Sequence, residues 1–219
     1  MKYLRKFETE EDVSMAASPN VVLIKDTAQV LYNVPRPLNG VYIQHVNGSL
    51  YTLNQWTEKG FTNALANGVA LLDDSASFVI SKEAVSFPYW SSNYTEQIQG
   101  VKMTSAQSIA LKDFAGKANT ELMLETDTDG ASYVCSNYRF PNGQKNGYLP
   151  ALGELNVAYA HLDAINAALQ AIGGTIIEGY TRTSTQYSAT MTWWFSWSDA
   201  TLGSQSKNSK GTTRVFSEL

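Results

Sequence analysis

Residues 151–172 read ALGELNVAYAHLDAINAALQAI, and apolar residues recur at every third or fourth position of this stretch. The recurring residues are Leu155, Tyr159, Leu162, Ile165, Leu169 and Ile172. This spacing places them on one face of a helix. Pro150 precedes the stretch and Gly173 and Gly174 follow it, as is common at helix ends. We therefore expect one helix from about Ala151 to Ile172, with one face in a hydrophobic core.

A second helix is expected upstream. Ser105 can act as its N-cap, Ile109, Ala110 and Phe114 follow at helical spacing, and Gly116 is a stop signal. A shorter helix is expected from Asn119.

Around these helices the sequence is typical of short antiparallel strands. Residues 41–46 and 49–53 flank Asn47-Gly48, a two-residue hairpin turn. Residues 67–72 and 76–81 form a second pair around Asp73-Asp74-Ser75. No alternation of parallel strands with helices is present, so the pattern predicts an α+β fold.

Composition limits the classes of function. The chain has 219 residues, 43% of them hydrophobic, which is enough for one large domain with a sizeable core. A net charge of -4 and the absence of a Lys/Arg stripe argue against nucleic acid as a partner. Cys135 is the only cysteine, so no intramolecular disulfide is expected. Neither a secretory signal nor a long apolar run is present, which predicts no membrane insertion and a place in the cytoplasm or on a phage virion.

The first 37 residues differ in character from the rest. Residues 7–13 are acidic, residues 21–24 form a short apolar strand candidate, and Pro35-Arg36-Pro37 excludes helix and central strand. We expect residues 1–37 to be an attachment arm and residues 38–219 to be the main domain.

The stretch Thr192-Trp193-Trp194-Phe195-Ser196-Trp197-Ser198 carries the functional argument. In a strand, Trp193, Phe195 and Trp197 would share one face, and Trp194, Ser196 and Ser198 the other. The first face is expected to be core. The second combines a large aromatic ring with small hydroxyls, a mixture typical of recognition surfaces.

Polar loops follow at residues 199–206 and 208–213. Loops on a rigid sheet often hold binding residues. The alternative is that these Ser-, Thr- and Asn-rich segments are ordinary solvated hairpin tips.

Several segments together resemble one family. They are Gly147-Tyr-Leu-Pro-Ala-Leu-Gly-Glu-Leu155, Ile172-Gly-Gly174, Ser184-Thr-Gln-Tyr-Ser188, Thr213-Arg-Val-Phe-Ser-Glu-Leu219, Asn137-Tyr-Arg-Phe-Pro-Asn-Gly-Gln-Lys145 and Asn67-Gly-Val-Ala70. In this order they resemble the variable proteins of diversity-generating retroelements, in the gut-bacterial and phage branch related to the Fibrobacter major paralogous domain. The resemblance spans roughly Gly40 to Leu219. Thr181-Arg182-Thr183 departs from the Tyr-Trp-Ser usual in such relatives.

The resemblance implies a C-type-lectin-like fold with a hypervariable face at about residues 180–213. It implies a fixed scaffold of Ser184, Thr185, Gln186, Trp193, Trp197, Lys207 and Arg214. It also implies an exposed ligand-binding set, comprising Arg182, Tyr187, Thr190, Met191, Trp194, Ser196, Ser198, Asp199, Thr201, Ser204 and Ser206, with Thr181, Gly203 and Ser209 as further candidates.

No motif favours catalysis or a cofactor. His45 and His161 lack metal-ligand spacing, and Asp127-Thr128-Asp129-Gly130 is better interpreted as a turn than as a calcium loop. Cys135 lies in a strand-like setting and is expected to be a buried structural thiol. We therefore expect no enzyme activity, no metal site and no cofactor.

The sequence thus favours a non-enzymatic ligand-binding protein. Trp194 and Tyr187 are expected to supply aromatic contact, with Arg182 and Asp199 as charged anchors. The leading hypothesis is a receptor-binding tip of a phage tail fibre, an adhesin that contacts a cell-surface protein or glycan, with homotrimers adding avidity. The alternative is a bacterial accessory or surface-displayed binding protein that uses the same face; an enzyme on this fold is a third.

Overall fold

The computed structural model describes residues 3–5, 30–32 and 37–219. The chain divides into two compact units, Met1–Leu38 and Asn39–Leu219. In the first unit β1 (Tyr3–Arg5) pairs antiparallel with β2 (Val30–Tyr32). The strand predicted at residues 21–24, and most of the predicted arm, lie outside the described residues.

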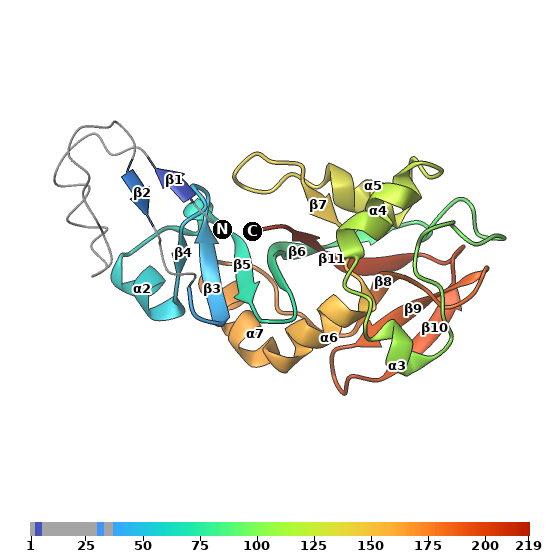
Figure 1. Ribbon diagram of the computed structural model, residues 1–219. Helices are drawn as coiled ribbons and strands as arrows, with labels where there is room; N and C mark the ends of the chain where they lie inside the picture. The colour runs from blue at the N-terminus through green and yellow to red at the C-terminus, as the bar shows by residue number, and fades with distance from the viewer. Residues whose placement is uncertain (1–2, 6–29, 33–36) are drawn as a thin grey trace. The chain divides into compact units, whose positions relative to one another are not determined.

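The larger unit contains a curled antiparallel sheet with the strand order β4-β3-β5-β6-β11-β7 (Figure 1). The two predicted hairpins are confirmed, since β3 pairs with β4 and β5 with β6. Gly48 has a φ of 88° in the first turn, a conformation that glycine adopts without steric cost. The strands are β3 (Gly40–His45), β4 (Leu50–Tyr51), β5 (Ala66–Leu72), β6 (Ser77–Phe87), β7 (Gly147–Tyr148) and β11 (Gly211–Ser217).

The central strands of this sheet are buried on both faces. Val69 and Leu71 of β5 belong to one hydrophobic cluster, whereas Ala70 and Leu72 belong to another. Successive side chains of a strand point to opposite faces, so an unbroken apolar run needs cover on both. Helices α6 and α7 cover one face and α4 and α5 the other (Figure 1). The protein is therefore α+β, as predicted.

Six α-helices are present among the described residues. They are α2 (Leu53–Glu58), α3 (Gln107–Ala110), α4 (Gly116–Leu124), α5 (Ala131–Asn137), α6 (Leu152–Ala160) and α7 (Leu162–Ala171), and a single 3₁₀ turn, η1 (Asn63–Leu65), precedes β5. No helix within the described ranges is both long and apolar enough to cross a lipid bilayer.

The single long helix predicted from Ala151 to Ile172 is wrong in one respect. His161, with φ -117° and ψ 14°, interrupts it and separates α6 from α7. The break lets the two helices pack on different partners, because α6 lies against β8 and β9 while α7 lies against β3 and β5. One straight helix could not reach both.

The helix predicted from Ser105 to Phe114 is reduced to the four residues of α3, and Ile109 and Phe114 are exposed. The chain leaves the helix where the Asp113 carbonyl accepts a hydrogen bond from Gly153 N at 2.9 Å. Gly116 does not stop a helix but begins α4. A Cβ at Gly116 would lie 2.2 Å from Glu154 Oε2, so this glycine permits close packing of α4 against the start of α6.

The prediction of a strand around Cys135 is also wrong, because Cys135 lies in α5. Its expected burial is confirmed, and burial raises the pKa of its thiol well above the usual range. Such a thiol has little thiolate character at neutral pH.

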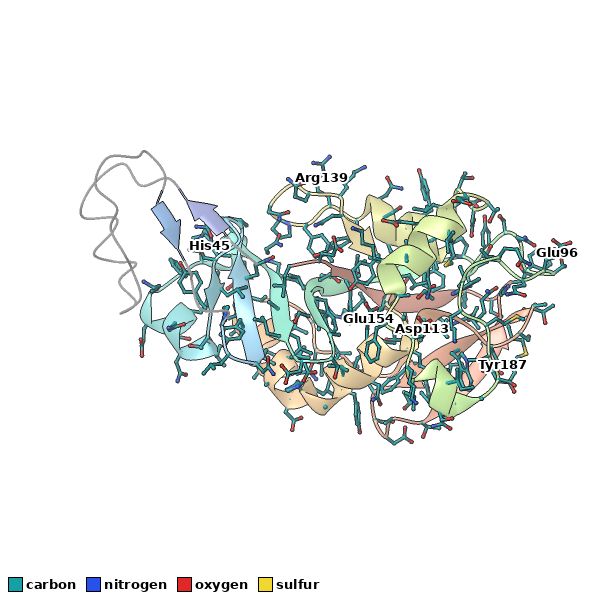
Figure 2. All side chains as sticks on the ribbon, in the orientation of Figure 1. His45, Glu96, Asp113, Arg139, Glu154 and Tyr187 are labelled. Carbon is teal, nitrogen blue, oxygen red and sulfur yellow. The ribbon has the colours of Figure 1, made fainter. Side chains whose placement is uncertain are left out.

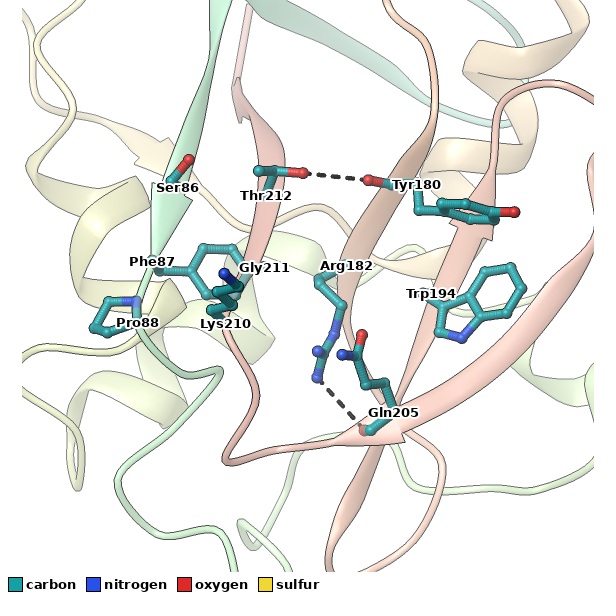
Figure 3. Close-up of a pocket in the computed structure, with 10 residues that line it drawn as sticks. All are labelled: Ser86, Phe87, Pro88, Tyr180, Arg182, Trp194, Gln205, Lys210, Gly211 and Thr212. Carbon is teal, nitrogen blue, oxygen red and sulfur yellow. Dashed lines mark hydrogen bonds between the residues drawn. The ribbon is translucent and has the colours of Figure 1, made fainter.

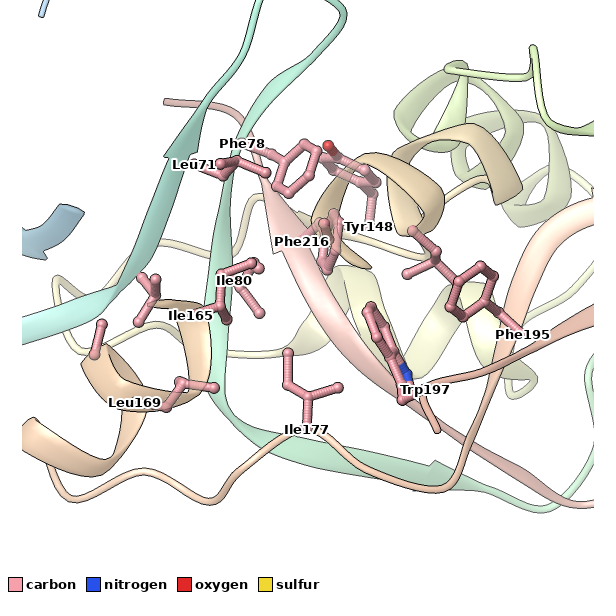
Figure 4. Packing of buried hydrophobic residues seen from close by; sticks show 14 of the residues in the cluster. Leu71, Phe78, Ile80, Tyr148, Ile165, Leu169, Ile177, Phe195, Trp197 and Phe216 are labelled. Carbon is pink, nitrogen blue, oxygen red and sulfur yellow. The ribbon is translucent and has the colours of Figure 1, made fainter. Parts of the chain in front are cut away.

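A second, three-stranded sheet has the order β10-β9-β8, formed by β8 (Tyr180–Gln186), β9 (Met191–Ser196) and β10 (Leu202–Ser206). The predicted alternation is confirmed on its inner face, since Trp193, Phe195 and Trp197 are buried. Phe195 and Trp197 join the cluster that contains Phe216 and Ile165 (Figure 4). The C-terminal strands therefore share one core with the helices.

Candidate functional site

Strand β8 is fixed from behind by buried polar side chains. Thr185 Oγ1 donates to Asp113 Oδ2 at 2.8 Å and accepts from Leu152 N at 3.0 Å. Asn119 Nδ2 donates both to Asp113 Oδ2 at 3.0 Å and to Ser184 Oγ at 3.1 Å. Fully bonded polar networks of this kind rigidify a structure. Ser184 and Thr185, which the resemblance places in the scaffold, are fully buried.

The side chain of Gln186 also anchors β8. Its amide donates to the carbonyls of Ile98 and Val101 at 3.0 and 3.1 Å, and its Oε1 accepts from Lys207 Nζ at 2.7 Å. Lys207 is fully buried, and its ammonium also lies 5.2 Å from the centroid of the Trp90 ring. Burial lowers the pKa of Lys207 to about 8. The predicted scaffold residues Gln186 and Lys207 thus tie β8 and the segment after β10 to one loop.

Arg214, also expected in the scaffold, is buried in β11. Its guanidinium donates to the carbonyls of Thr175 and Ile176 at 2.7 and 2.9 Å, and also to those of Ser81 and Lys82. It therefore holds the segment before β8 against β6.

The strand register determines which side chains of the small sheet share a face. Trp194 is the cross-strand partner of both Arg182 and Gly203, and Tyr180 is that of Ser196. Partners across an antiparallel pair project to the same side. One face therefore carries Tyr180, Arg182, Thr192, Trp194, Ser196, Gly203 and Gln205.

This face forms one wall of an open cleft of about 780 Å³ (Figure 3). The other wall comes from the end of β6 and the start of β11, which are neighbours because Phe87 pairs with Gly211. Such a volume is typical of sites for small organic ligands. The lining residues are Ser86, Phe87, Pro88, Tyr180, Arg182, Trp194, Gln205, Lys210, Gly211 and Thr212.

Arg182 is the buried charged group of the cleft. It is only 3% exposed, and its Nε and Nη2 donate to Thr192 Oγ1 at 3.2 and 2.7 Å. Nη2 also donates to the Ser206 carbonyl at 3.0 Å, whereas the buried Nη1 has no hydrogen-bond partner among the described atoms. Burial lowers the pKa of Arg182 to about 10, so the side chain remains a cation at neutral pH.

The aromatic wall is built by Trp194 and Tyr180. Their rings form an edge-to-face pair with centroids 5.0 Å apart, and Tyr180 is 64% exposed. The Trp194 indole lies over Gly203, where an added Cβ would stand 2.2 Å from the ring. A glycine at this position therefore decides where the indole can lie.

Three residues predicted to be exposed are buried instead. Thr181 points to the core face and accepts a hydrogen bond from Trp197 Nε1 at 2.6 Å. Arg182 forms the inner part of the cleft, and Ser196 is buried beside Ser198, with 2.9 Å between their hydroxyl oxygens. The expectation of exposure was wrong for Thr181, Arg182 and Ser196.

Met191, Ser204 and Ser206 do not share a face with Trp194, although Ser206 is exposed as expected and Met191 and Ser204 are half-buried. Ser204 pairs with Trp193 and Ser206 with Met191, which places all three on the same side of the sheet as Trp193. The residue of β10 that lines the cleft is Gln205. Because side chains alternate, a displacement of one residue in register moves every side chain to the other face.

The other predicted residues lie at the ends of the small sheet. Ser198, Asp199 and Thr201 are exposed in the turn between β9 and β10, where Asp199 Oδ1 accepts from Thr201 N at 3.0 Å. Tyr187 and Thr190 lie between β8 and β9, and the Tyr187 ring packs edge-on against Trp193 at 4.9 Å. Among the predicted set, only Arg182 and Trp194 line the cleft.

The sequence interpretation missed Tyr180, Gln205 and the whole opposite wall. Tyr180 lies two residues before Arg182, so the alternation of side chains along a strand predicts that the two share a face. Nothing local in the sequence indicates that Phe87 and Lys210 meet the small sheet.

Two buried carboxylates, Asp113 and Glu154, lie close behind the small sheet (Figure 2). Glu154 accepts from Ala151 N at 2.7 Å and from Tyr148 Oη at 3.2 Å, and burial raises its pKa to about 8. These acids are hydrogen-bonded to the backbone and to neighbouring side chains. We interpret them as supports of the fold.

Comparison of the chain with protein-family models, with curated proteins and with solved structures gave no match.

Proposed function

We propose that this chain is a non-enzymatic ligand-binding protein that recognises its target in the cleft between the small sheet and the β6–β11 pair. The observation that carries the proposal is the convergence of an exposed and a half-buried aromatic ring, Tyr180 and Trp194, on a buried cation within one open cleft of about 780 Å³. Binding sites are commonly concave and largely apolar, with a few polar groups that set orientation.

The support behind the cleft favours recognition by a preorganised surface. Ser184, Thr185, Gln186 and Lys207 are fully buried and hydrogen-bonded, so β8 has little freedom to move. Tyr180 and Trp194, by contrast, project from the sheet and retain exposed ring surface. Rigid aromatic side chains provide contact area at a small cost in conformational entropy.

The proposed function includes a proposed fold family for the larger unit. The α+β fold with a small C-terminal sheet is compatible with a C-type-lectin-like domain, and the buried Ser184-Thr185-Gln186 motif agrees with the scaffold that the family resemblance implies. On this proposal the chain is a retroelement-diversified variable protein and serves as the receptor-binding tip of a phage tail fibre. Its target lies on a bacterial surface.

The test is binding of the purified full chain to a panel of intact gut-bacterial cells. We would compare the wild type with the double variant Tyr180→Ala, Trp194→Ala, which removes the aromatic wall. The matched control is Tyr133→Ala, because Tyr133 is also an exposed aromatic residue but lies on α5, outside the cleft.

We expect selective binding by the wild type and by Tyr133→Ala, and at least a tenfold loss for the double variant, which should remain folded with a melting temperature only a few degrees lower. Equal binding by all three proteins would refute the assignment of this cleft. Loss of binding only in Tyr133→Ala would move the site to the opposite side of the central sheet.

A further inference from the structure

The guanidinium of Arg182 is a buried positive charge without a negative partner. None of the salt bridges among the described residues involves Arg182, and Nη1 is left without any hydrogen-bond acceptor. A buried charge and an unsatisfied buried donor both oppose folding unless something compensates them. The contacts to Thr192 and to the Ser206 carbonyl use only Nε and Nη2.

The other charged residue that lines the cleft is also positive. Lys210 adds a second cationic side chain at the rim, and there is no Asp or Glu among the described residues that line the cleft. Figure 3 shows Arg182 between Trp194 and Tyr180 on one side and Phe87 and Lys210 on the other. An anion that entered between the aromatic walls would meet Arg182 at the base.

We infer that the cleft binds an acidic saccharide, with the carboxylate of a uronic acid residue directed at the positive charge of Arg182 and Lys210 and the sugar ring against Trp194 and Tyr180. This inference rests on the proposed function, because it names the ligand class of the same cleft. Charge-assisted hydrogen bonds of this kind are among the stronger polar contacts in proteins.

The polar groups around the cleft suit a sugar. Ser86, Gln205 and Thr212 contribute two hydroxyls and one amide, which can bond to ring hydroxyls from several directions. The aromatic wall offers a flat apolar surface to the C–H face of a pyranose.

An extended peptide cannot add to β8 beside this cleft. Peptides often bind by adding a strand to a free sheet edge. On β8 that edge is occupied, because Thr212 Oγ1 donates to the Tyr180 carbonyl and Thr213 Oγ1 to the Arg182 carbonyl, both at 3.3 Å.

The experiment measures binding of oligogalacturonate and oligoglucuronate to the purified full chain by isothermal titration calorimetry. The fully methyl-esterified oligosaccharides serve as neutral counterparts with the same rings. Three variants accompany the wild type: Arg182→Met, Lys210→Gln, and Lys112→Gln as a control for removal of an exposed lysine outside the cleft.

For the wild type we expect at least one of the two acids to bind tenfold or more tightly than its ester. Arg182→Met should abolish this preference, Lys210→Gln should reduce affinity for the acid about threefold, and Lys112→Gln should leave both affinities unchanged. If Arg182→Met fails to fold, as a circular dichroism melt would reveal, Lys210→Gln decides the question by lowering acid binding but not ester binding.

Equal affinity for acid and ester, or an acid preference retained in Arg182→Met, overturns the inference. So does the absence of binding to either acid, including the case in which a peptide with a free C-terminal carboxylate binds in the cleft. The proposed function is tested independently of this inference, because its test is whether loss of Tyr180 and Trp194 abolishes binding to cells.

Discussion

Trp193 and Trp194 are adjacent in the sequence, yet truncation of each should have opposite consequences. Trp193 is 5% exposed, its indole Nε1 donates to the Thr104 carbonyl at 2.9 Å, and its ring packs against Tyr187 at 4.9 Å. Trp193→Ala therefore leaves a large cavity and an unpaired carbonyl. Truncation of a buried aromatic side chain lowers the free energy of unfolding by about 3 to 5 kcal/mol.

Trp194 is only half-buried and makes its main ring contact with Tyr180 at 5.0 Å. An aromatic pair contributes about 0.5 to 1.5 kcal/mol beyond the burial of its area. Because the part of the ring that is buried adds to this, we expect Trp194→Ala to lower the free energy of unfolding by about 1 to 2 kcal/mol. For a chain of this size each kcal/mol shifts the melting temperature by about 2 to 4 °C, so the two variants should differ by about 5 to 10 °C.

The assay is urea unfolding followed by circular dichroism, together with binding to cells. Trp193→Ala should lower the urea midpoint strongly, whereas Trp194→Ala should lower it only slightly but should lose binding. Similar m-values for both variants would show that the unfolding reaction itself is unchanged. Equal destabilisation by the two substitutions would refute the assignment of opposite faces.

Three further substitutions test other parts of the structure. Burial raises the pKa of Glu154 from 4.5 to about 8, so the folded chain retains a proton that the unfolded chain releases. The free energy of unfolding should therefore fall as pH rises between about 5 and 8, by at most about 1.4 kcal/mol per pH unit, and urea titrations of Glu154→Gln across this range should show a smaller fall. Gly203→Ala should displace the Trp194 indole, because the new Cβ would lie 2.2 Å from the ring; a changed tryptophan fluorescence spectrum would report it, and an unchanged one would contradict the packing. Ala200 has a φ of 57°, so Ala200→Gly should raise the free energy of unfolding by about 1 kcal/mol; a lower melting temperature would argue against this turn.

Local patterns predicted those parts of the fold that depend on local geometry. The alternation of Trp193, Phe195 and Trp197 predicted their burial because a strand has a period of two residues. The Asn47-Gly48 turn predicted the first hairpin for a similar reason, since few residues other than glycine tolerate a positive φ.

The errors concern properties that neighbouring residues do not determine. His161 interrupts an apolar pattern that continues through it, because α6 and α7 pack on different strands. Gln205 was missed because the register across the turn at Ala200 decides which residues of β10 face Trp194. The second wall of the cleft depends on the pairing of Phe87 with Gly211, which are far apart in the sequence.

The hydroxyls of Thr212 and Thr213 also bear on the behaviour of the protein at high concentration. An unpaired strand edge is a template on which a second copy can add its own strand, and such addition leads to aggregation. Because these hydroxyls bond to the carbonyls of Tyr180 and Arg182, the β8 edge is closed to that reaction. Two threonines thus keep a strand beside the cleft from self-association with the same strand of a second copy.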